Sequence, residues 1–318
     1  MSELSFRPAS VDDTRFFADL ETAYNPDEPE DPEVERYDWE SRDPETVYED
    51  YVVARSGEEC GSVSTNHKVW EKMPERYADV RAMIRRDLAS SSRWNEMYEF
   101  IEDRAVAGGA LILVAGARED DTGKADAIRA RGYKKTRLHK AWELDLVATR
   151  ERILATRTES LARTRDQGVR LITIAEDTDP DRYSKLFACS NEGQMDEPTT
   201  VPHVLDGFDV FMKWLKAPNI REDRWWIARE GDRIVGMSVL AYPPQRGNVW
   251  TAWTCTARSV RGRGLARALK LETLAQAIEL GVPKVRTAND GENAPILHLN
   301  EQMGYQRLPG WLEFHRTA

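Results

Sequence analysis

A glycine-rich turn of the kind that binds phosphate carries the clearest chemistry in this sequence. It lies within residues 256–270, after a strand-like run at 249–255 and at the start of a predicted helix. Gly262 and Gly264 remove side chains where an anion would approach, and Ala266 keeps the first helical turn thin. Backbone N–H groups at the positive end of a helix bind phosphate well. The sequence therefore predicts a site for a phosphate-bearing ligand here.

Two common phosphate-binding motifs do not fit this turn. A P-loop requires GxxxxGK[ST], and the dinucleotide fingerprint requires GxGxxG with an acidic residue about 20 positions later. Here Arg263 separates the two glycines and Arg267 occupies the place of the third. The Arg-Gly-Arg-Gly run occurs once, without interleaved aromatic residues, on a chain of net charge −10. These features argue against a nucleic-acid partner.

The turn resembles the pyrophosphate loop of the GNAT acetyltransferase superfamily, through the pattern Arg261-x-x-Gly264-x-Ala266 after a strand. The following segment is similar to that family in its order of strand (284–288), turn and cap, short helix (294–303) and Gly-aromatic pair. The resemblance covers about residues 245–316, and its matching positions are Thr287, Asn289, Asn293, Ile296, Asn300, Met303, Gly304 and Tyr305.

This resemblance implies that the chain binds acetyl-CoA (coenzyme A). It implies that the pyrophosphate lies on Arg261, Gly262, Arg263, Gly264, Leu265, Ala266 and Arg267. It also implies that the strand before the loop offers backbone donors to the acyl and pantetheine groups, at Thr254, Cys255 and Thr256. Asn293 is expected to cap the later helix, and Asn300 to lie near the pantetheine.

The catalytic candidates are less well defined. Asn300 lies on the apolar face of its predicted helix, so its amide needs a hydrogen-bond partner on a neighbouring strand or on the cofactor. Many GNAT enzymes have a tyrosine there as general acid, and this chain departs from that pattern. A substrate ammonium with a pKa near 10 must lose a proton before attack. The base is sought among Glu192, Asp196, Glu197 and His203, and the sequence does not choose among them.

Cys255 offers an alternative chemistry, since a thiolate can carry an acyl group. No neighbouring histidine or cation activates it in the sequence, and a small buried cysteine is the commoner role. Direct transfer within a ternary complex is therefore favoured over a covalent acyl-enzyme.

The whole chain has 318 residues, enough for two ordinary domains. It has no apolar run near 18 residues and no signal-peptide pattern at its start, which predicts no membrane partner. Its three scattered cysteines favour a reducing cytoplasm. The five histidines show no metal-ligand spacing, so no metal is expected.

A weak internal repeat indicates a duplicated α/β unit. Residues 123–144 echo residues 291–314, and a strand-like run precedes each copy. We expect an α/β mixed-sheet fold of two tandem GNAT-like domains, at 1–146 and 168–318, joined by a helical linker at 147–167. The first copy has bulky charged residues at 79–87 instead of a glycine loop, so it is expected to be degenerate. The layout resembles mycothiol synthase-like proteins and predicts one cofactor site per chain.

Two further features have alternative interpretations. Acidic residues crowd segment 26–50, which reads as a solvated, partly mobile loop or as a negative rim for a cationic substrate. The tryptophans Trp225, Trp226, Trp250 and Trp253 are expected in the core, or alternatively along an acceptor cleft.

The sequence thus favours an acetyl-CoA-dependent N-acetyltransferase acting on an amine of a small molecule. The catalytic candidates are Asn300, Glu192 and Glu197. The alternatives are an acyl-CoA-binding sensor or scaffold with little turnover, and a nucleotide-binding α/β protein.

Overall fold

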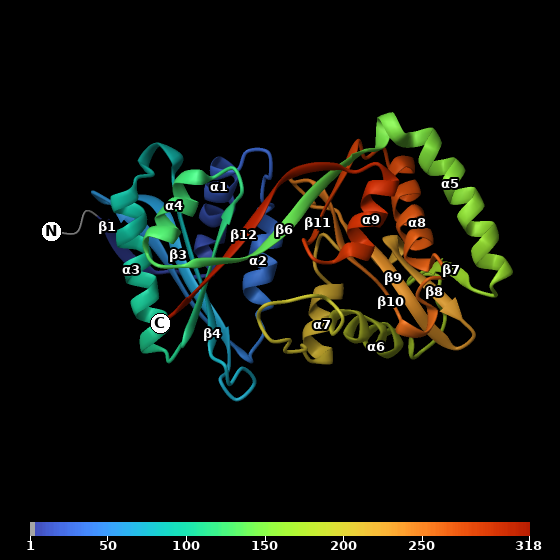
Figure 1. Cartoon of the computed structure of the whole chain (residues 1–318), viewed down its shortest axis with the longest axis horizontal. Helices are drawn as coiled ribbons and strands as arrows, with labels where there is room; N and C mark the ends of the chain where they lie inside the picture. Colours follow the sequence, from blue (N-terminus) through green and yellow to red (C-terminus); the bar gives the residue numbers. More distant parts are fainter. Residues whose placement is uncertain (1–3) are drawn as a thin grey trace.

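The computed structural model describes residues 4–318, and its strands form one mixed sheet of 12 strands within that range (Figure 1). The sheet order is β1-β2-β3-β4-β5-β12-β6-β11-β10-β9-β8-β7. The strands are β1 (Leu4–Pro8), β2 (Thr46–Arg55), β3 (Glu58–Lys68), β4 (Tyr77–Ile84), β5 (Ile112–Arg118), β6 (Lys134–Asp145), β7 (Arg170–Thr173), β8 (Trp225–Glu230), β9 (Arg233–Ala241), β10 (Val249–Thr256), β11 (Lys284–Asp290) and β12 (Gln306–Thr317). The helices are α1 (Thr14–Tyr24), α2 (Pro32–Glu40), α3 (Ser91–Ala107), α4 (Thr122–Ala130), α5 (Leu146–Asp166), α6 (Arg182–Gln194), α7 (Phe208–Leu215), α8 (Leu265–Glu279) and α9 (Ala294–Met303), with short 3-10 turns at Val11–Asp13, Arg86–Leu88, Glu222–Arg224 and Arg258–Val260.

The two halves of the chain repeat one order of elements. In the first half β4, α3, β5, α4 and β6 follow one another, and in the second half β10, α8, β11, α9 and β12 do the same. In each half the strand before the long helix pairs in parallel with the strand after it, β4 with β5 and β10 with β11. The duplicated mixed α/β fold predicted from the sequence is therefore confirmed.

The counterpart of the glycine loop in the first half lies at residues 85–90, later than the predicted segment 79–87. Most of that predicted segment belongs to β4, which the alternation of buried and exposed residues places within the sheet. The loop itself contains no glycine, and Ser90 caps α3 by accepting the backbone N–H of Arg93.

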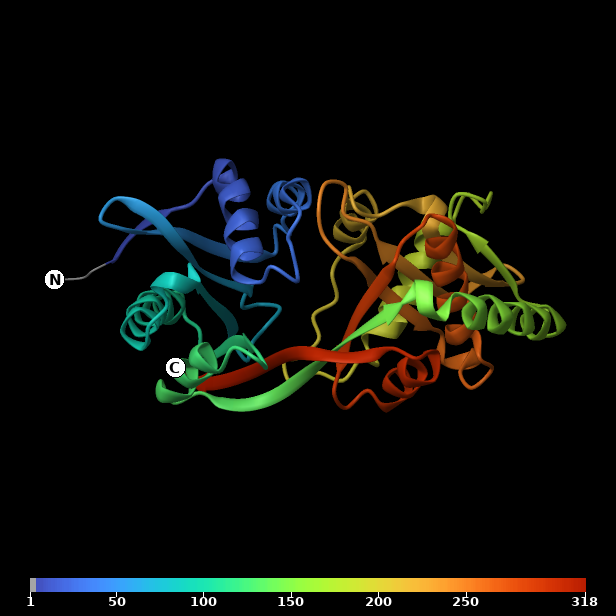
Figure 2. The same ribbon diagram turned by 90° about the horizontal axis from the view of Figure 1, so that it is seen from above.

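The last strands of the two halves cross over. β12 ends the second half yet pairs with β5 of the first half, and β6 ends the first half yet pairs with β11 of the second. The two strands also pair with each other and bridge the halves side by side, as Figures 1 and 2 show. Neither half therefore completes its own sheet, an arrangement that the sequence analysis did not anticipate. The division at 1–146, 147–167 and 168–318 stays a prediction.

The long helix α8 is buried almost all round. Buried residues occupy every turn from Leu265 to Ile278. α5 packs on the outer side of α8, and Arg157 of α5 donates to the buried carboxylate of Glu272 at 2.8 Å. The helix that joins the halves therefore also covers the helix that follows the glycine loop.

The acidic segment 26–50 is ordered, so the expectation of a solvated, partly mobile loop is wrong. α2 and the first residues of β2 lie in it, and Asp31 is only 3% exposed. One carboxylate oxygen of Asp31 caps α2, while the other accepts the backbone N–H groups of Gln245 and Arg246 at 2.6 and 2.9 Å. The segment is held because it docks on the loop between β9 and β10.

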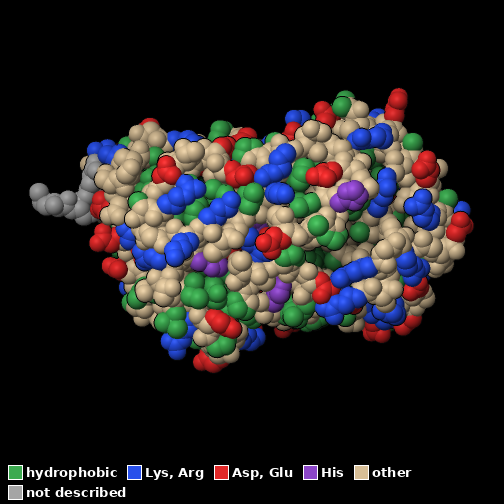
Figure 3. Space-filling view, in the orientation of Figure 1, with side chains coloured by type: hydrophobic (Ala, Val, Ile, Leu, Met, Phe, Trp, Pro, Cys, Tyr) green, Lys and Arg blue, Asp and Glu red, His purple; other side chains and the backbone are tan. Residues whose placement is uncertain are grey.

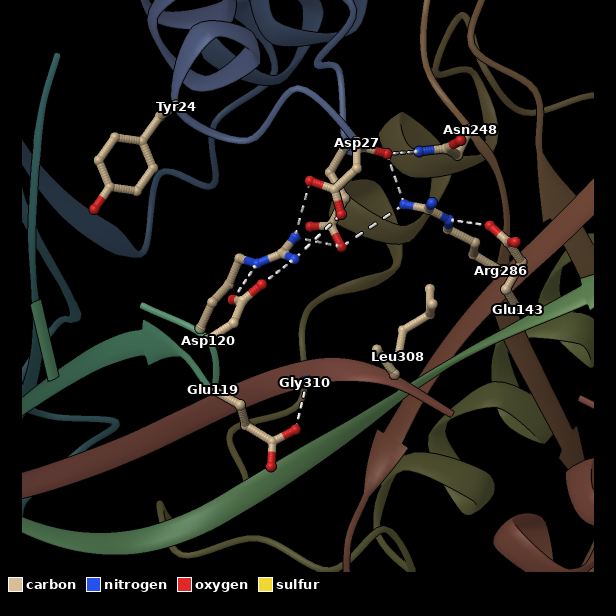
Figure 4. A network of polar contacts seen from close by, with 12 residues as sticks. Tyr24, Asp27, Glu119, Asp120, Glu143, Asn248, Arg286, Leu308 and Gly310 are labelled. Carbon is tan, nitrogen blue, oxygen red and sulfur yellow. Dashed lines mark hydrogen bonds and ion pairs between the residues drawn. The ribbon is translucent and has the colours of Figure 1, made fainter. Parts of the chain in front are cut away.

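A buried arginine from each half holds this junction together (Figure 4). Arg118 pairs with Asp27 at 3.2 Å, and Arg286 donates to the backbone oxygen of the same residue at 2.7 Å. Arg286 also pairs with Glu143 at 2.9 Å, and Asn248 donates to the Asp27 backbone oxygen. The alternative role of the acidic segment, a negative rim for a cationic substrate, stays a prediction. On the face in Figure 3 acidic and basic side chains are interspersed.

No helix within residues 4–318 has the length and apolar character needed to cross a membrane. These same residues also contain no group of three or more His, Cys, Asp or Glu side chains arranged to bind a metal.

Candidate functional site

The glycine loop turns through two left-handed residues. Gly262 has φ +76° and Gly264 has φ +85°, and Gly264 is the N-cap of α8. An added Cβ at either position would meet no protein atom within 4 Å. The two glycines are therefore required by backbone conformation, which other residues adopt at a cost, and not by crowding within the protein.

This turn leaves backbone donors free. Within residues 4–318 no acceptor is found for the N–H groups of Gly262, Gly264, Leu265, Ala266 and Arg267. The Nε of Arg267 is also buried without a hydrogen-bond partner in the same part of the chain. Unsatisfied donors at a helix N-terminus need an anion or water. The loop is thus built to accept a ligand with several acidic oxygens.

The other two arginines of the loop are engaged elsewhere. Arg263 donates to Glu230 at 2.8 Å and to Gln167 at 3.2 Å, and it does not line the cavity beside the loop. The prediction that its side chain binds the pyrophosphate is therefore not supported. Arg261 lines the cavity, but its guanidinium pairs with Asp196 at 2.5 Å.

A cavity of about 830 Å³ runs from this loop along the edge of β10 and beneath α9. It exists because β10 and β11 pair only at Val249 and Trp250 and then separate. From Thr251 onward the edge of β10 facing β11 is open. The predicted strand residues Thr254, Cys255 and Thr256 line the cavity together with Asn289 and residues of α9, which are Pro295, Ile296, His298, Leu299 and Gln302.

β10 contains a β-bulge at Ala252. Thr251 pairs with Leu240 and Trp253 with Val239, so Ala252 has no opposite residue on β9. A bulge of this kind redirects side chains and interrupts the ladder of hydrogen bonds. Ala252 and Trp253 lie on the walls of the 830 Å³ cavity and also of a second one.

The second cavity, of about 220 Å³, lies between β10, α6 and α7. α6 and α7 lie on one side of the sheet, whereas α5, α8 and α9 lie on the other (Figure 1). Its walls are aromatic and polar, with Phe187, Phe211, Trp214, Trp253, Ser190, Asn191, Gln194, Glu197 and Asp206 among them. The two cavities share Glu197, Ala252 and Trp253, so they meet at the bulge from opposite faces of the sheet.

Glu197 has the surroundings of a general base. It is half-buried where the two cavities meet, and its carboxylate has no hydrogen bond or ion pair within residues 4–318. Burial raises the pKa of Glu197, against the opposing effect of His139, His203 and Arg137. A carboxylate with a raised pKa is a stronger proton acceptor, which suits a base in a cleft.

The other predicted base candidates are less suited. Glu192 accepts the backbone N–H of Arg258 at 2.6 Å and does not line either cavity. Asp196 lies between Arg258 and Arg261, and these hydrogen bonds lower its pKa strongly. His203 bonds through Nε2 to the backbone oxygen of Glu197 at 2.8 Å. Each of them is occupied in holding the loop or the segment after α6.

The two predicted asparagines agree with the expectations only in part. Asn300 is fully buried, donates to Asn289 at 2.7 Å and does not line the cavity, so contact with pantetheine is not supported. The neighbouring strand is thus the partner of its amide. Asn293 is the N-cap of α9, but its side chain makes no capping hydrogen bond and it lines the cavity instead.

Cys255 does not have the environment of a nucleophile. It is buried, and its Sγ lies 3.6 Å from the backbone oxygen of Cys189. The side chain of Cys189 and burial raise the pKa of the Cys255 thiol well above its usual range. Since the reactive form is the thiolate, Cys255 contributes backbone and packing only.

Of the four tryptophans, three pack within the protein, as the core interpretation expects, and one lines the cavities, as the cleft interpretation expects. Trp225 is fully buried, Trp226 donates to Gln276, and Trp250 packs on Trp311, whereas Trp253 lines both cavities.

Several cavity residues are not among the candidates predicted from the sequence. Lys270 is buried and lines the larger cavity. Thr251 lines the same cavity and Trp214 the smaller one. The only sequence signal for Lys270 is a lysine between two leucines in an apolar helix, and it becomes informative only when the Tyr305 ring and the cavity are known to lie beside it.

Comparisons with known proteins agree with this geometry. Residues 192–305 match the model of the acetyltransferase (GNAT) family. No curated protein sequence matches the chain significantly. Among solved structures, a tandem GNAT protein from the clavulanic acid biosynthesis pathway has a TM-score of 0.73 and 17% identity, over 99% of this chain and 98% of that one.

Two other structures are similar. A GCN5-related N-acetyltransferase from Sphaerobacter thermophilus has a TM-score of 0.69 and 17% identity, over 100% of this chain and 96% of its own. A GCN5-related glucosamine N-acetyltransferase region of a fungal multi-domain enzyme has a TM-score of 0.67 and 14% identity, over 99% of this chain and 38% of its own. The likeness to mycothiol synthase-like proteins stays a prediction. Residues 192–305 are therefore similar to the acetyltransferase (GNAT) family, and the chain as a whole has the fold of a tandem GNAT protein.

Proposed function

We propose that this protein is an N-acyltransferase that uses an acyl-coenzyme A, with acetyl-CoA as the simplest donor, and a small-molecule amine as acceptor. The observation that carries the proposal is the meeting of two cavities at Ala252, one leading to the free amides of the glycine loop and the other to an aromatic pocket. A donor and an acceptor entering from opposite faces of the sheet would meet at the bulge, as direct transfer requires.

The residues present fit the donor. The loop amides of residues 262–267 and the Arg267 guanidinium would hold the pyrophosphate, and the open edge of β10 would hold the pantetheine through its backbone. Acetyl-CoA would supply an acyl group activated as a thioester. Backbone N–H groups near the bulge would polarise its carbonyl as preorganised donors do.

Glu197 would remove the proton from the acceptor. A protonated amine is not a nucleophile, and Glu197 lies where both cavities open toward each other. We propose Glu197 as the base and leave Glu192 and Asn300 with structural roles, because Glu192 holds Arg258 and Asn300 is bonded to Asn289.

The acceptor pocket favours a small amine with an apolar part. Its volume of about 220 Å³ lies below the roughly 300–1,000 Å³ of sites for drug-sized ligands. The rings of Phe211, Trp214 and Trp253 offer apolar contact and cation–π attraction. The first half of the chain contributes through Lys68, which pairs with the wall residue Asp206 at 2.6 Å.

A thiol-release assay with acetyl-CoA and a panel of small amines tests this proposal. Turnover with at least one amine, lost in Glu197→Gln while coenzyme A binding remains, is the expected result. Binding of coenzyme A without turnover on any amine would favour the sensor or scaffold. A melting temperature that rises with NAD or ATP but not with coenzyme A would favour a nucleotide-binding protein.

The three free cysteines suit the reducing cytoplasm that we propose as its location.

A further inference from the structure

Lys270 is a buried lysine with no counter-ion within residues 4–318. It is 2% exposed in the middle of α8, beside an apolar cluster that contains Leu271, Leu274 and Tyr305. No carboxylate within residues 4–318 pairs with its ammonium. Its Nζ lies over the face of the Tyr305 ring, 5.1 Å from the ring centroid. A cation–π contact does not satisfy the hydrogen-bonding capacity of an ammonium.

Two buried hydroxyl groups on the same side of the sheet also lack partners. Thr251 Oγ1 and Tyr305 OH make no hydrogen bond of good geometry within residues 4–318. The two hydroxyl groups lie close enough for a weak contact, since Thr251 opposes the rise that burial causes in the pKa of Tyr305. A buried polar group without a well-formed hydrogen bond is destabilising. Three such groups together therefore indicate a site that a ligand completes.

Two of these groups line the larger cavity, and Tyr305 packs on Lys270 behind them. Lys270 and Thr251 both line it, and Thr251 is the residue next to Ala252, where the cavity meets the acceptor pocket. The reacting end of a donor held by the glycine loop would reach this point. Lys270 and Thr251 therefore lie beside the acyl group and not beside the phosphates.

The chemistry of the three groups selects the kind of acyl group. An ammonium and two hydroxyl groups are all hydrogen-bond donors, and a carboxylate can accept from all three. An apolar acyl end would leave them unsatisfied, and an amine would be repelled by Lys270. We propose that Lys270, Thr251 and Tyr305 bind a carboxylate at the far end of the acyl chain, so that the preferred donor is the coenzyme A thioester of a short dicarboxylic acid. This inference rests on the proposed acyl-CoA site.

Calorimetry with purified protein tests the inference without knowledge of the acceptor. Succinyl-CoA and butyryl-CoA have acyl chains of equal length, and only succinyl-CoA ends in a carboxylate. We expect succinyl-CoA to bind on the order of 10- to 100-fold more tightly than butyryl-CoA, because butyryl-CoA lacks the carboxylate that accepts a charge-assisted hydrogen bond.

Proton uptake provides a second measurement. Desolvation lowers the pKa of Lys270 to about 7, so at pH 8 about nine-tenths of the free amine is neutral. A bound carboxylate would favour the ammonium, and succinyl-CoA should therefore take up close to one proton per site at this pH. Butyryl-CoA and free coenzyme A should take up far less. Buffers of different ionisation enthalpy give the number of protons.

The variant Lys270→Met should abolish both the preference and the proton uptake while free coenzyme A binds as before. Lys124→Met is the matched control, because Lys124 also has a lowered pKa, about 8, and faces the Trp94 ring, but it lies in the first half of the chain. It should leave the preference unchanged. If Lys270→Met does not fold, Thr251→Val and Tyr305→Phe, which only remove hydroxyl groups, should each reduce the preference.

Several results would overturn the inference. One is equal affinity of the wild-type protein for succinyl-CoA and butyryl-CoA. Another is equal proton uptake with free coenzyme A, which would assign Lys270 to the phosphates. A third is an equal loss for every donor in Lys270→Met, which would assign Lys270 to the transfer reaction. Failure of every coenzyme A derivative to bind, in contrast, would refute the proposed function itself.

Discussion

Replacing Gly264 by alanine separates the ligand-binding role of the glycine loop from its contribution to folding. Gly264 has φ +85°, a conformation that costs an L-residue about 1–2 kcal/mol. An added methyl meets no protein atom within 4 Å, so no clash adds to that cost. The loss of unfolded-chain entropy offsets about 0.4–1 kcal/mol of it. A net cost of about 1 kcal/mol should lower the melting temperature by about 2–4 °C.

The effect on binding should be much larger. The residue lines the donor cavity and aligns the free amides of Gly262 and of residues 264–267. A hydrogen bond to a charged group is worth about 1.5–3 kcal/mol. Misalignment of two such bonds would weaken binding of acetyl-CoA by more than about 100-fold.

Gly281→Ala is the matched control for this experiment. Gly281 follows the other end of α8, has φ +75°, and also has no protein atom within 4 Å of an added Cβ. It should show the same fall in melting temperature with unchanged affinity for acetyl-CoA. Calorimetry and thermal unfolding measure the two quantities. Equal affinities of the two variants would refute the assignment of the loop to the pyrophosphate.

Three further predictions follow from the geometry. Glu197→Gln should lower kcat by about 100-fold or more with little change in acetyl-CoA binding. It should also remove the rise of wild-type kcat/KM with pH, because only the ionised carboxylate accepts the proton and burial raises its pKa. An unchanged pH profile would exclude Glu197 as the base. Cys255→Ala should retain turnover, since the thiol is buried with a raised pKa, and complete loss of turnover with intact coenzyme A binding would instead support an acyl-enzyme. Arg286→Met should destabilise the protein by about 1.5–3 kcal/mol, because it removes charged hydrogen bonds to Glu143, which keeps Lys284 as a partner, and to the Asp27 backbone oxygen. Thermal unfolding should show a larger fall than in Arg221→Met, which removes only the exposed pair with Asp223. Equal small falls in both variants would show that the junction adds little.

The sequence determined those features that depend on neighbouring residues. The helix predicted at 294–303 is α9, Ala294–Met303, because an asparagine, a proline and a glycine mark its ends locally. The turn at Gly262 and Gly264 and the fold family were likewise readable, since left-handed glycines and a phosphate loop are short-range signals.

Only the tertiary structure decided which side chains face the site. Arg263 and Arg267 are four residues apart in one loop, yet Arg263 reaches Glu230 and Gln167 while the Nε of Arg267 stays unpartnered. Asp196 and Glu197 are adjacent acidic residues, yet two arginines pair with Asp196, whereas Glu197 lines both cavities without an ion pair within residues 4–318. Local sequence carries no information on such distant partners.

The exchange of β6 and β12 and the burial of Lys270 have the same physical origin. Strand order is set by pairing between segments far apart in the chain, and either order would satisfy the local pattern of both strands. The environment of Lys270 depends on the ring of Tyr305 and on the cavity along the open edge of β10, which are formed by segments distant from α8 in the sequence. An isolated lysine in an apolar helix thus gains its chemical meaning only from the packing around it.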